Sequence, residues 1–268
     1  MRYRKEESGS FMKIIRNIAV ALSMYSKIPM PIWKWKDDDM KYALGFIGLV
    51  GAIIGAIEYG IYLLGTYFAI PVFVKTLLWT AIPLLVTGGF HVDGFMDVQD
   101  ALHSYQPKEE KLRILKDPHI GAFAVISLGL YGCLYIAATY MLLETGRKRF
   151  ILLAAIGFVL ARGIGAFLGT VLKHAKQDGL LHEETKKTGT ATKILLILTI
   201  LLAVAGMFYL NLLAAALICV TQLLFVLWYR HKCYKEFGGI SGDTVGYFIT
   251  ESELLVLIVT AIFAWWKL

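Results

Sequence analysis

Long apolar stretches dominate the sequence and constrain its fold more than any other feature. A helix that crosses a bilayer needs roughly 20 mainly apolar residues, because its backbone polar groups must be satisfied within the segment. Hydrophobic residues make up 57% of the 268 residues and charged residues 18%, whereas soluble domains contain about 45–50% apolar residues. We therefore predict an all-α, polytopic membrane helical bundle with about seven transmembrane helices and an N-terminal interfacial helix. The seven are expected at 43–69, 71–89, 118–143, 150–172, 193–209, 211–229 and 244–266.

The distribution of positive charge predicts how the bundle is oriented. The net charge of +7 would suggest a nucleic-acid partner in a soluble protein, but in a membrane protein it marks loops held on the cytoplasmic side. With the N-terminus in the cytoplasm, most of the 27 Lys and Arg residues fall on that side. We predict a multi-pass protein of the cell (inner or plasma) membrane, with the lipid bilayer and no nucleic acid as its partner.

The N-terminal segment differs in character from the rest of the chain. Residues 1–42 lack a clean signal-peptide pattern, and residues 11–28 place three basic side chains among apolar positions at helical spacing. This predicts a cytoplasmic or interfacial segment followed by a helical bundle at 43–268. No repeat or linker is visible, so 1–268 is expected to form a single integral membrane domain. The three widely spaced cysteines are expected to be reduced.

Three carboxylates gather directly after the second apolar stretch, in the sequence GGFHVDGFMDVQD. On an α-helix, at about 100° per residue, Asp93, Asp97 and Asp100 share one face. Unpaired like charges repel and are costly beside a membrane, so a cation is expected to hold them together. All-oxygen ligands suit Mg²⁺, which typically uses one or two carboxylates together with the phosphates of a substrate. The alternative is a solvated, acidic start to an interfacial helix.

Other groups near these acids can complete such a site. His91 can serve as a ligand, a general base, an orienting residue or a hydrogen-bonded structural residue. Lys116 can hold a phosphate, and Asp117 can hold a second metal ion or cap the helix that follows. Arg162 lies inside an apolar stretch, where a charged side chain usually faces the bundle interior with a partner such as a carboxylate or a substrate phosphate.

The stretch FGGISGDTVGYF near the C-terminus resembles a phosphate-cradling turn. Its glycines give a permissive backbone, and Asp243-Thr244 opens a helix whose N-terminus favours anions. The alternative is an ordinary N-capped turn. Because Asp243 lies on the same predicted face of the membrane as the first acids, the two are expected to meet.

At these residues the sequence resembles the cobalamin synthase family of adenosylcobinamide-GDP ribazoletransferases, over nearly its whole length. The first matching signature is LSMYSKIPMP at 22–31. The other matching positions are His91, Asp93, Gly94, Asp97, Asp100, Lys116, Asp117, Gly121, Arg162, Gly163, Gly238, Gly239, Gly242, Asp243, Thr244, Gly246 and Glu253. The sequence departs from the family pattern at Ala101, His119 and Thr250.

The resemblance implies a Mg²⁺-dependent phosphoryl transfer between adenosylcobinamide-GDP and α-ribazole or its 5′-phosphate, with an active site on the cytoplasmic face. The catalytic residues it implies are His91, Asp93, Asp97, Asp100, Lys116 and Arg162. The nucleotide-binding residues it implies are Lys116, Gly121, Gly239, Gly242 and Thr244. The metal ligands it implies are Asp93, Asp97, Asp100, Asp117, Asp243 and Glu253.

Two other functions fit parts of the sequence. A CDP-alcohol phosphotransferase also uses aspartates at a cytoplasmic membrane face, but its Ala-Arg after the Asp-Gly motif is replaced here by Asp97-Val98. An ion-coupled transporter could use Glu58 and Arg162 as intramembrane relays, but the chain shows no paired halves. The sequence leaves open whether the chain forms a homo-oligomer.

Overall fold

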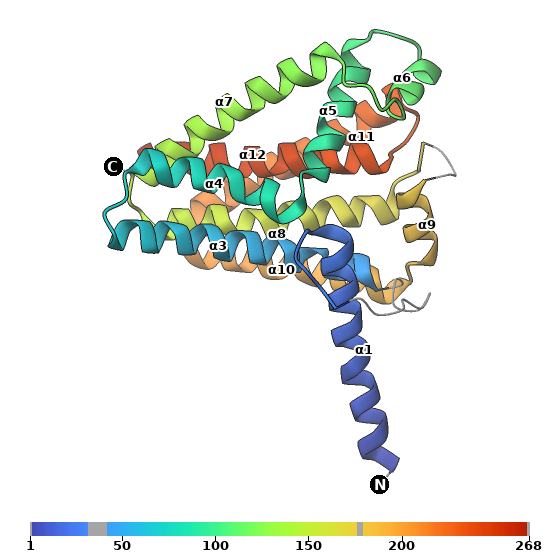
Figure 1. Ribbon diagram of the computed structural model, residues 1–268, viewed down its shortest axis with the longest axis horizontal. Coiled ribbons are helices and arrows are strands. Elements are labelled where there is room, and N and C mark those ends of the chain that lie inside the picture. Colours follow the sequence, from blue (N-terminus) through green and yellow to red (C-terminus); the bar gives the residue numbers. More distant parts are fainter. Residues whose placement is uncertain (1, 32–41, 176–178, 267–268) are drawn as a thin grey trace.

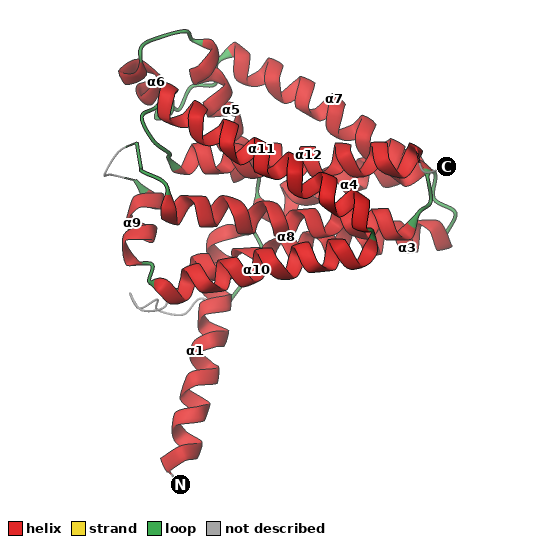
Figure 2. Cartoon of the chain, turned by 180° about the vertical axis from the view of Figure 1, so that it is seen from behind, coloured by secondary structure: helices red, strands yellow, loops and turns green. Residues whose placement is uncertain are grey.

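The computed structural model describes residues 2–31, 42–175 and 179–266, and this part of the chain consists of helices and connecting loops (Figure 2). The helices are α1 (Arg2–Tyr25), η1 (Ala43–Phe46), α3 (Ile47–Tyr67), α4 (Val72–Thr87), α5 (Phe90–His103), α6 (Lys108–Ile114), α7 (Ala122–Glu144), α8 (Lys148–Val171), α9 (Leu180–Lys187), α10 (Thr190–Leu210), α11 (Leu212–Glu236) and α12 (Gly242–Trp266).

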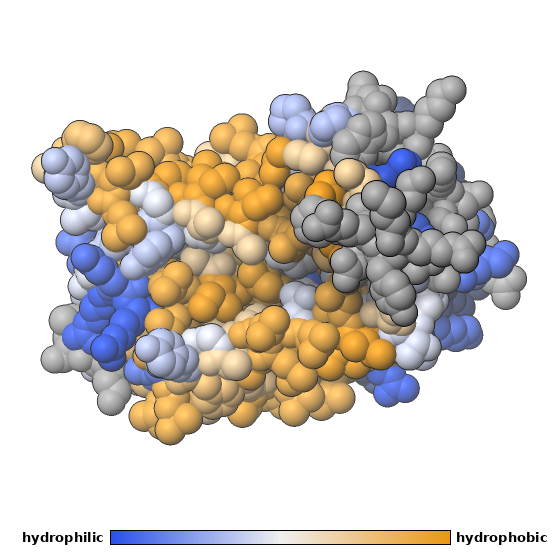
Figure 3. Space-filling view, turned by 90° about the horizontal axis from the view of Figure 1, so that it is seen from below, coloured by the Kyte–Doolittle hydropathy of each residue, from blue (hydrophilic) through white to orange (hydrophobic). Residues whose placement is uncertain are grey.

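The long apolar helices confirm the predicted membrane bundle. Within the described residues, six spans are long and apolar enough to cross a bilayer, namely η1 with α3, α7, α8, α10, α11 and α12. A seventh is obtained only if α4 and α5 count together, and these two helices meet at an angle of 94°. On the face shown in Figure 3, apolar side chains cover the middle, and polar side chains lie toward the two ends. The chain is therefore a multi-pass membrane protein.

Helix α8 forms the centre of the bundle, where it packs against α3, α10 and α12. Membrane helices gain little from burying apolar surface against one another, so close packing of small residues contributes much of their association. Gly51 and Gly55 of α3 face α8, and a side chain at either position would overlap the backbone of Phe158 or Ala155. These glycines therefore bring α3 directly against the central helix.

The N-terminal helix α1 leaves the bundle at an angle to the spans (Figure 1). Its C-terminal end is anchored, because Val20, Ala21 and Leu22 are buried beside η1 and α3. This agrees with the predicted N-terminal helix outside the spans. The same end of the bundle carries α5, α6 and α9 (Figure 1), and the candidate site lies there.

Candidate active site

A glycine elbow carries the chain from α4 into α5. Gly88 and Gly89 have φ angles of 71° and 81°, in the left-handed region that glycine adopts without a steric cost. Thr87 Oγ1 accepts a hydrogen bond from the Gly89 N–H at 3.1 Å. The 94° bend turns α5 away from the direction of the spans, so α5 lies across the end of the bundle (Figure 1). The expected span at 71–89 therefore ends at this elbow.

The N-terminal signature at 22–31 packs against this elbow. The Lys27 N–H donates to the Val86 carbonyl oxygen at 2.7 Å, in the last turn of α4. A side chain at Gly88 would meet the aliphatic part of Lys27 at 2.5 Å. The signature thus supports the segment that positions the acids rather than contributing a ligand itself.

Two further glycines let α5 approach α12. A Cβ at Gly94 would lie 2.8 Å from the Asp243 carbonyl oxygen, and one at Gly246 would lie 3.0 Å from the His91 carbonyl oxygen. The distance at Gly94 is too short for a larger residue, and one at Gly246 would require the backbone of α5 to shift by a few tenths of an ångström. Because the two backbones touch here, Asp243 is held beside the acids of α5.

Asp93, Asp97, Asp100 and Asp243 therefore form one acid cluster at this end of the bundle. Burial, together with the negative charges of Asp93, Asp243 and Asp100, raises the pKa of Asp97 to about 7. None of the three side-chain carboxylates on α5 accepts a hydrogen bond or forms an ion pair with any described residue. The cluster thus holds excess negative charge, which a bound cation would neutralise.

A narrow cleft opens beside these acids. It is lined by Asp93, Asp97 and Asp100 of α5 and by His119 and Gly121 of the loop before α7. A side chain at Gly121 would overlap the Asp100 carboxylate, so glycine lets the loop pass the acid without displacing its side chain. In the described part of the chain, no three acid, histidine or cysteine side chains converge closely enough to hold a metal ion by themselves.

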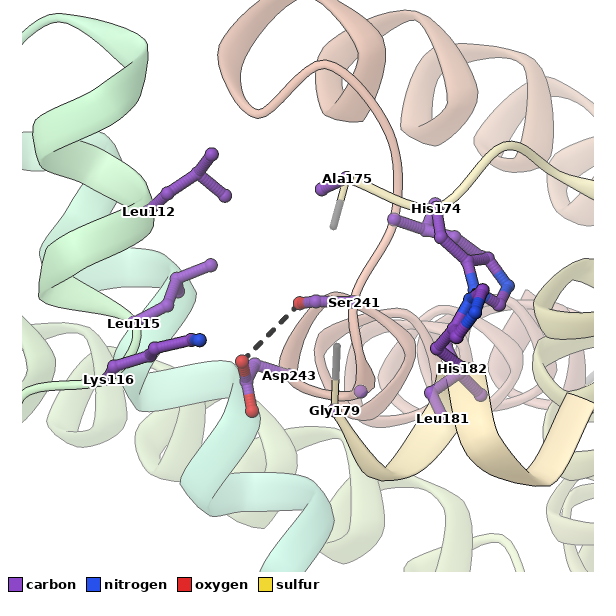
Figure 4. Close-up of a pocket in the computed structure, with 12 residues that line it drawn as sticks. Leu112, Leu115, Lys116, His174, Ala175, Gly179, Leu181, His182, Ser241 and Asp243 are labelled. Atoms are coloured by element: carbon purple, nitrogen blue, oxygen red, sulfur yellow. Dashed lines mark hydrogen bonds between the residues drawn. The ribbon is translucent and has the colours of Figure 1, made fainter. Parts of the chain in front are cut away.

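The structure separates Lys116 from its neighbour Asp117. Lys116 and Asp243 line the same cavity, in which Asp243 interacts electrostatically with Lys116 and Asp93 (Figure 4). The exposed Asp117 instead accepts a hydrogen bond from the His119 N–H at 3.0 Å and pairs with His119 Nδ1 at 2.7 Å. These contacts hold the pKa of Asp117 below its usual range. Asp117 is therefore placed in a local turn and not in the acid cluster.

Arg162 and Glu253 form an ion pair inside the bundle. Arg162 Nη1 lies 2.5 Å from Glu253 Oε1, and the two side chains are 0% and 8% exposed. Glu253 follows Asp243 by ten residues, which is about 15 Å along a helix. His91 is also buried, on the face of α5 that contacts α12. The structure therefore does not bring Arg162, Glu253 and His91 into the cleft with the acids.

The glycines of the C-terminal turn have different surroundings. Gly239 packs against the backbone of the loop after α8, where a Cβ would lie 2.5 Å from the Lys173 carbonyl oxygen. Thr244 is buried. Its N–H donates to Ser241 Oγ at 3.3 Å and its Oγ1 accepts the Ser241 N–H at 2.8 Å, the reciprocal pair of an N-terminal helix cap. Gly242 alone is open, with no atom near its would-be side chain, and it lines the cavity beside Asp243.

Sequence reasoning missed the far wall of this cavity. His174, Leu181 and His182 line it from the loop after α8 and from α9 (Figure 4). The two histidines are polar residues in a predicted cytoplasmic loop, and their spacing matches no metal-site pattern. Only the contact between this loop and the C-terminal turn, which joins residues far apart in sequence, brings them to Asp243.

Comparison with known proteins decides the family. The model of the family described as cobalamin-5-phosphate synthase matches residues 17–261. The chain belongs to this family. It is thus a membrane transferase of cobalamin biosynthesis. This family is neither that of the CDP-alcohol phosphotransferases nor one of ion-coupled transporters.

This chain is similar to its matching relatives over nearly their full length. The adenosylcobinamide-GDP ribazoletransferase of Lachnoclostridium phytofermentans is 36% identical over 91% of this chain and 92% of its own. The proteins of that name from Clostridium botulinum strain Alaska E43 and Clostridium perfringens strain 13 are 34% and 32% identical, over 93% and 94% of this chain and 98% and 100% of theirs. No solved structure matches the chain.

Proposed function

We propose that the chain is an adenosylcobinamide-GDP ribazoletransferase whose reaction takes place at the acid cluster. A ribose hydroxyl of α-ribazole, or of its 5′-phosphate, attacks the cobinamide-bearing phosphorus of adenosylcobinamide-GDP. The bond from that phosphorus to GMP breaks, and adenosylcobalamin or its 5′-phosphate forms. The observation that carries this proposal is the meeting of Asp243 with the carboxylates of α5 in a member of this family.

The chemistry of the acid cluster fits Mg²⁺. Its carboxylates are hard oxygen ligands, and those on α5 are without a cationic partner among the described residues. Since no three of these side chains form a cage by themselves, we propose that Asp93, Asp97, Asp100 and Asp243 share the ion with the substrate diphosphate. An ion held by these residues would supply positive charge to the diphosphate and to the leaving GMP.

The remaining predicted residues act around this centre in our proposal. Lys116, beside Asp243, attracts the phosphates of the nucleotide, and Gly242 leaves room for the substrate, while Gly121 lets the loop before α7 pass close to Asp100. Arg162 of α8 and Glu253 of α12 hold these two helices together beneath the site. His91 is buried on the face of α5 that contacts α12. The loops at this end carry the excess of Lys and Arg, which supports a cytoplasmic active site. Two further statements remain predictions, namely that residues 1–268 form a single domain and that the chain forms a homo-oligomer.

The proposal is tested with purified membranes that contain the chain. Membranes are incubated with adenosylcobinamide-GDP, α-ribazole and Mg²⁺, and the release of GMP and formation of adenosylcobalamin are measured together. We expect both products in equal amounts, none after chelation with EDTA, and recovery when Mg²⁺ is restored. Asp93→Asn should lower the rate by at least about 100-fold, since preorganised charge stabilisation contributes on this scale, while the variant still inserts into membranes. Mg²⁺-independent turnover would contradict the metal role.

A further inference from the structure

The cavity beside Asp243 has the size and lining of a small-ligand site. Its volume of about 270 Å³ is close to the lower end of the roughly 300–1,000 Å³ range of such sites. Leu112 and Leu115 of the α6 region form one apolar wall, and Leu181 and Ile240 line the cavity from α9 and the turn before α12. Asp243 joins the cavity to the acid cluster, so a molecule bound here lies directly beside the proposed phosphoryl-transfer centre (Figure 4).

Of the two nucleosides in the proposed reaction, the lining suits α-ribazole better than guanosine. The dimethylbenzimidazole base of α-ribazole is an apolar bicycle without exocyclic amino or keto groups. Guanine presents several N–H donors, which need acceptors when buried. Asp243 is the one carboxylate among the described residues that line the cavity, and it already belongs to the acid cluster. The remaining apolar walls match the apolar base.

Hydrogen bonds determine which ring nitrogen carries the proton in His174 and His182, two histidines at the edge of the cavity. His174 Nε2 lies 2.9 Å from the Gly169 carbonyl oxygen, and a carbonyl can only accept, so Nε2 carries the proton. In the neutral ring, His174 Nδ1 is then an acceptor, and His182 Nδ1, 3.2 Å away, donates to it. A neutral His182 therefore keeps the lone pair on Nε2, which has no hydrogen-bond partner among the described residues.

The backbone holds this histidine pair in place. The Ala175 N–H donates to the Ile240 carbonyl oxygen at 2.8 Å, and the Ile240 N–H donates to the Lys173 carbonyl oxygen at 2.9 Å. These bonds join the loop after α8 to the turn that starts α12. The chain from Gly169 through His174 to His182 thus has the arrangement of a general base oriented by a second group.

We propose that this cavity binds the α-ribazole nucleoside and that His182 Nε2 is the general base for its attacking ribose hydroxyl. The inference rests on the proposed function. The hydroxyl O–H bond breaks and its proton moves to His182 Nε2, while the ribose oxygen bonds to the cobinamide-bearing phosphorus. The phosphorus–oxygen bond to GMP breaks, and its electron pair leaves with GMP. His182 then releases the proton to water, which returns it to the neutral state.

The role of His182 is tested with His182→Gln in purified protein. We expect kcat to fall by about 10²–10⁴-fold, the usual contribution of a general base, with an unchanged KM for adenosylcobinamide-GDP. In the described part of the lining the other titratable side chains are Lys116, His174 and Asp243, and all three remain in this variant. Added imidazole should restore part of the rate of His182→Ala, whose short side chain leaves room for it.

A matched control is His231→Gln, because His231 is exposed on α11 and faces a different cavity. This variant should keep the kcat of the parent. A thermal unfolding scan in detergent verifies that each variant is folded. If His182→Gln keeps the parent kcat, or if imidazole fails to rescue a slow, folded His182→Ala protein, His182 is not the base.

The identity of the bound nucleoside is tested separately by binding and by Leu181→Asn. Calorimetry should detect α-ribazole binding to the protein without adenosylcobinamide-GDP, and Leu181→Asn should raise the KM for α-ribazole at least 10-fold while the KM for adenosylcobinamide-GDP stays unchanged. The reverse pattern, with GMP binding weakened by Leu181→Asn and α-ribazole unaffected, would overturn the assignment. A parent protein that releases no GMP would instead refute the proposed function itself.

Discussion

Asp97 is the acid on which the charges of the cluster converge. It lies between Asp93 and Asp100 on α5 and also interacts with Asp243 of α12, and these like charges and burial raise its pKa to about 7. A folded protein keeps such an arrangement at a cost in stability, because like charges at this spacing repel. Acids that destabilise the fold and face a cleft are therefore best explained by what they bind.

We expect Asp97→Asn to separate activity from stability. Removing this carboxylate should lower GMP release by at least about 100-fold, since it withdraws a ligand from the reacting centre. The unfolding temperature in detergent without Mg²⁺ should stay the same or rise, because repulsion within the cluster is relieved. Glu109→Gln, which removes an exposed carboxylate from α6 at the same end of the bundle, is the control and should change neither quantity. Loss of stability together with activity would indicate a structural role.

The acids on α5 could be predicted from sequence because a helix fixes their spacing. The partner of Arg162 could not be predicted, because Glu253 lies 91 residues away in sequence. The sequence left open whether this partner is a carboxylate or a substrate phosphate. The same limit applies to His182. The role proposed for His182 depends on its contact with His174 and on a cavity formed by three separate segments. No local sequence pattern predicts that these segments meet.

At the scale of elements, the site depends on how closely α5 lies against α12. Gly94 and Gly246 leave room for backbone contact, and the stacked rings of Phe95 and Tyr247, with centroids 5.9 Å apart, continue the contact beside them. The position of Asp243 relative to the acids of α5 is therefore set by two glycines rather than by a direct bond between the acids.

Gly94→Ala should reduce activity by moving these two helices apart. The added methyl group would lie 2.8–2.9 Å from backbone atoms of Asp243, which cannot rotate away as a side chain can. We expect kcat to fall at least 10-fold, because small displacements of positioned groups are costly for catalysis. Gly129→Ala in α7 is the matched control, since no atom lies near its would-be side chain, and it should keep the parent rate. Equal rates for both variants would contradict the proposed contact.

Hydropathy predicted most of the elements, because long apolar runs leave a chain few alternatives to a spanning helix. The predicted break between 193–209 and 211–229 is confirmed at Asn211, whose side chain caps α11 by accepting the Ala214 N–H at 2.9 Å. The elbow at Gly88 and Gly89 was missed. A glycine pair allows a bend but does not require one, and the apolar pattern continues up to it.

At the scale of the whole molecule, a buried ion pair connects the central helix to the last one. Arg162 of α8 and Glu253 of α12 are enclosed by the bundle. Glu58 of α3 is also fully buried, and it interacts electrostatically with both of them. Removing one member of such a pair leaves a buried charge without compensation, which typically costs about 3–5 kcal/mol.

We therefore expect a thermodynamic cycle of these two residues to be strongly non-additive. Arg162→Met should lower the free energy of unfolding most, because two buried acids then lack a cation. The double variant Arg162→Met with Glu253→Met should be more stable than Arg162→Met alone. Denaturant unfolding in detergent measures the four free energies. Additive effects of the two substitutions would show that the pair contributes no coupling energy.

The sequence distance between Arg162 and Glu253 also has a consequence for how the chain is made. At typical synthesis rates, the 91 residues between them take about 5–20 s to emerge from the ribosome. During that interval Glu58 of α3 is available, but Glu253, the acid that forms the ion pair with Arg162, has not yet been synthesised, and an arginine at the centre of a helix costs about 2.5–3.5 kcal/mol on translocon insertion scales. The final helix thus adds a stabilising partner to the central one after both are made, so we expect products that stop short of α12 to be cleared by membrane proteases more readily than the full chain.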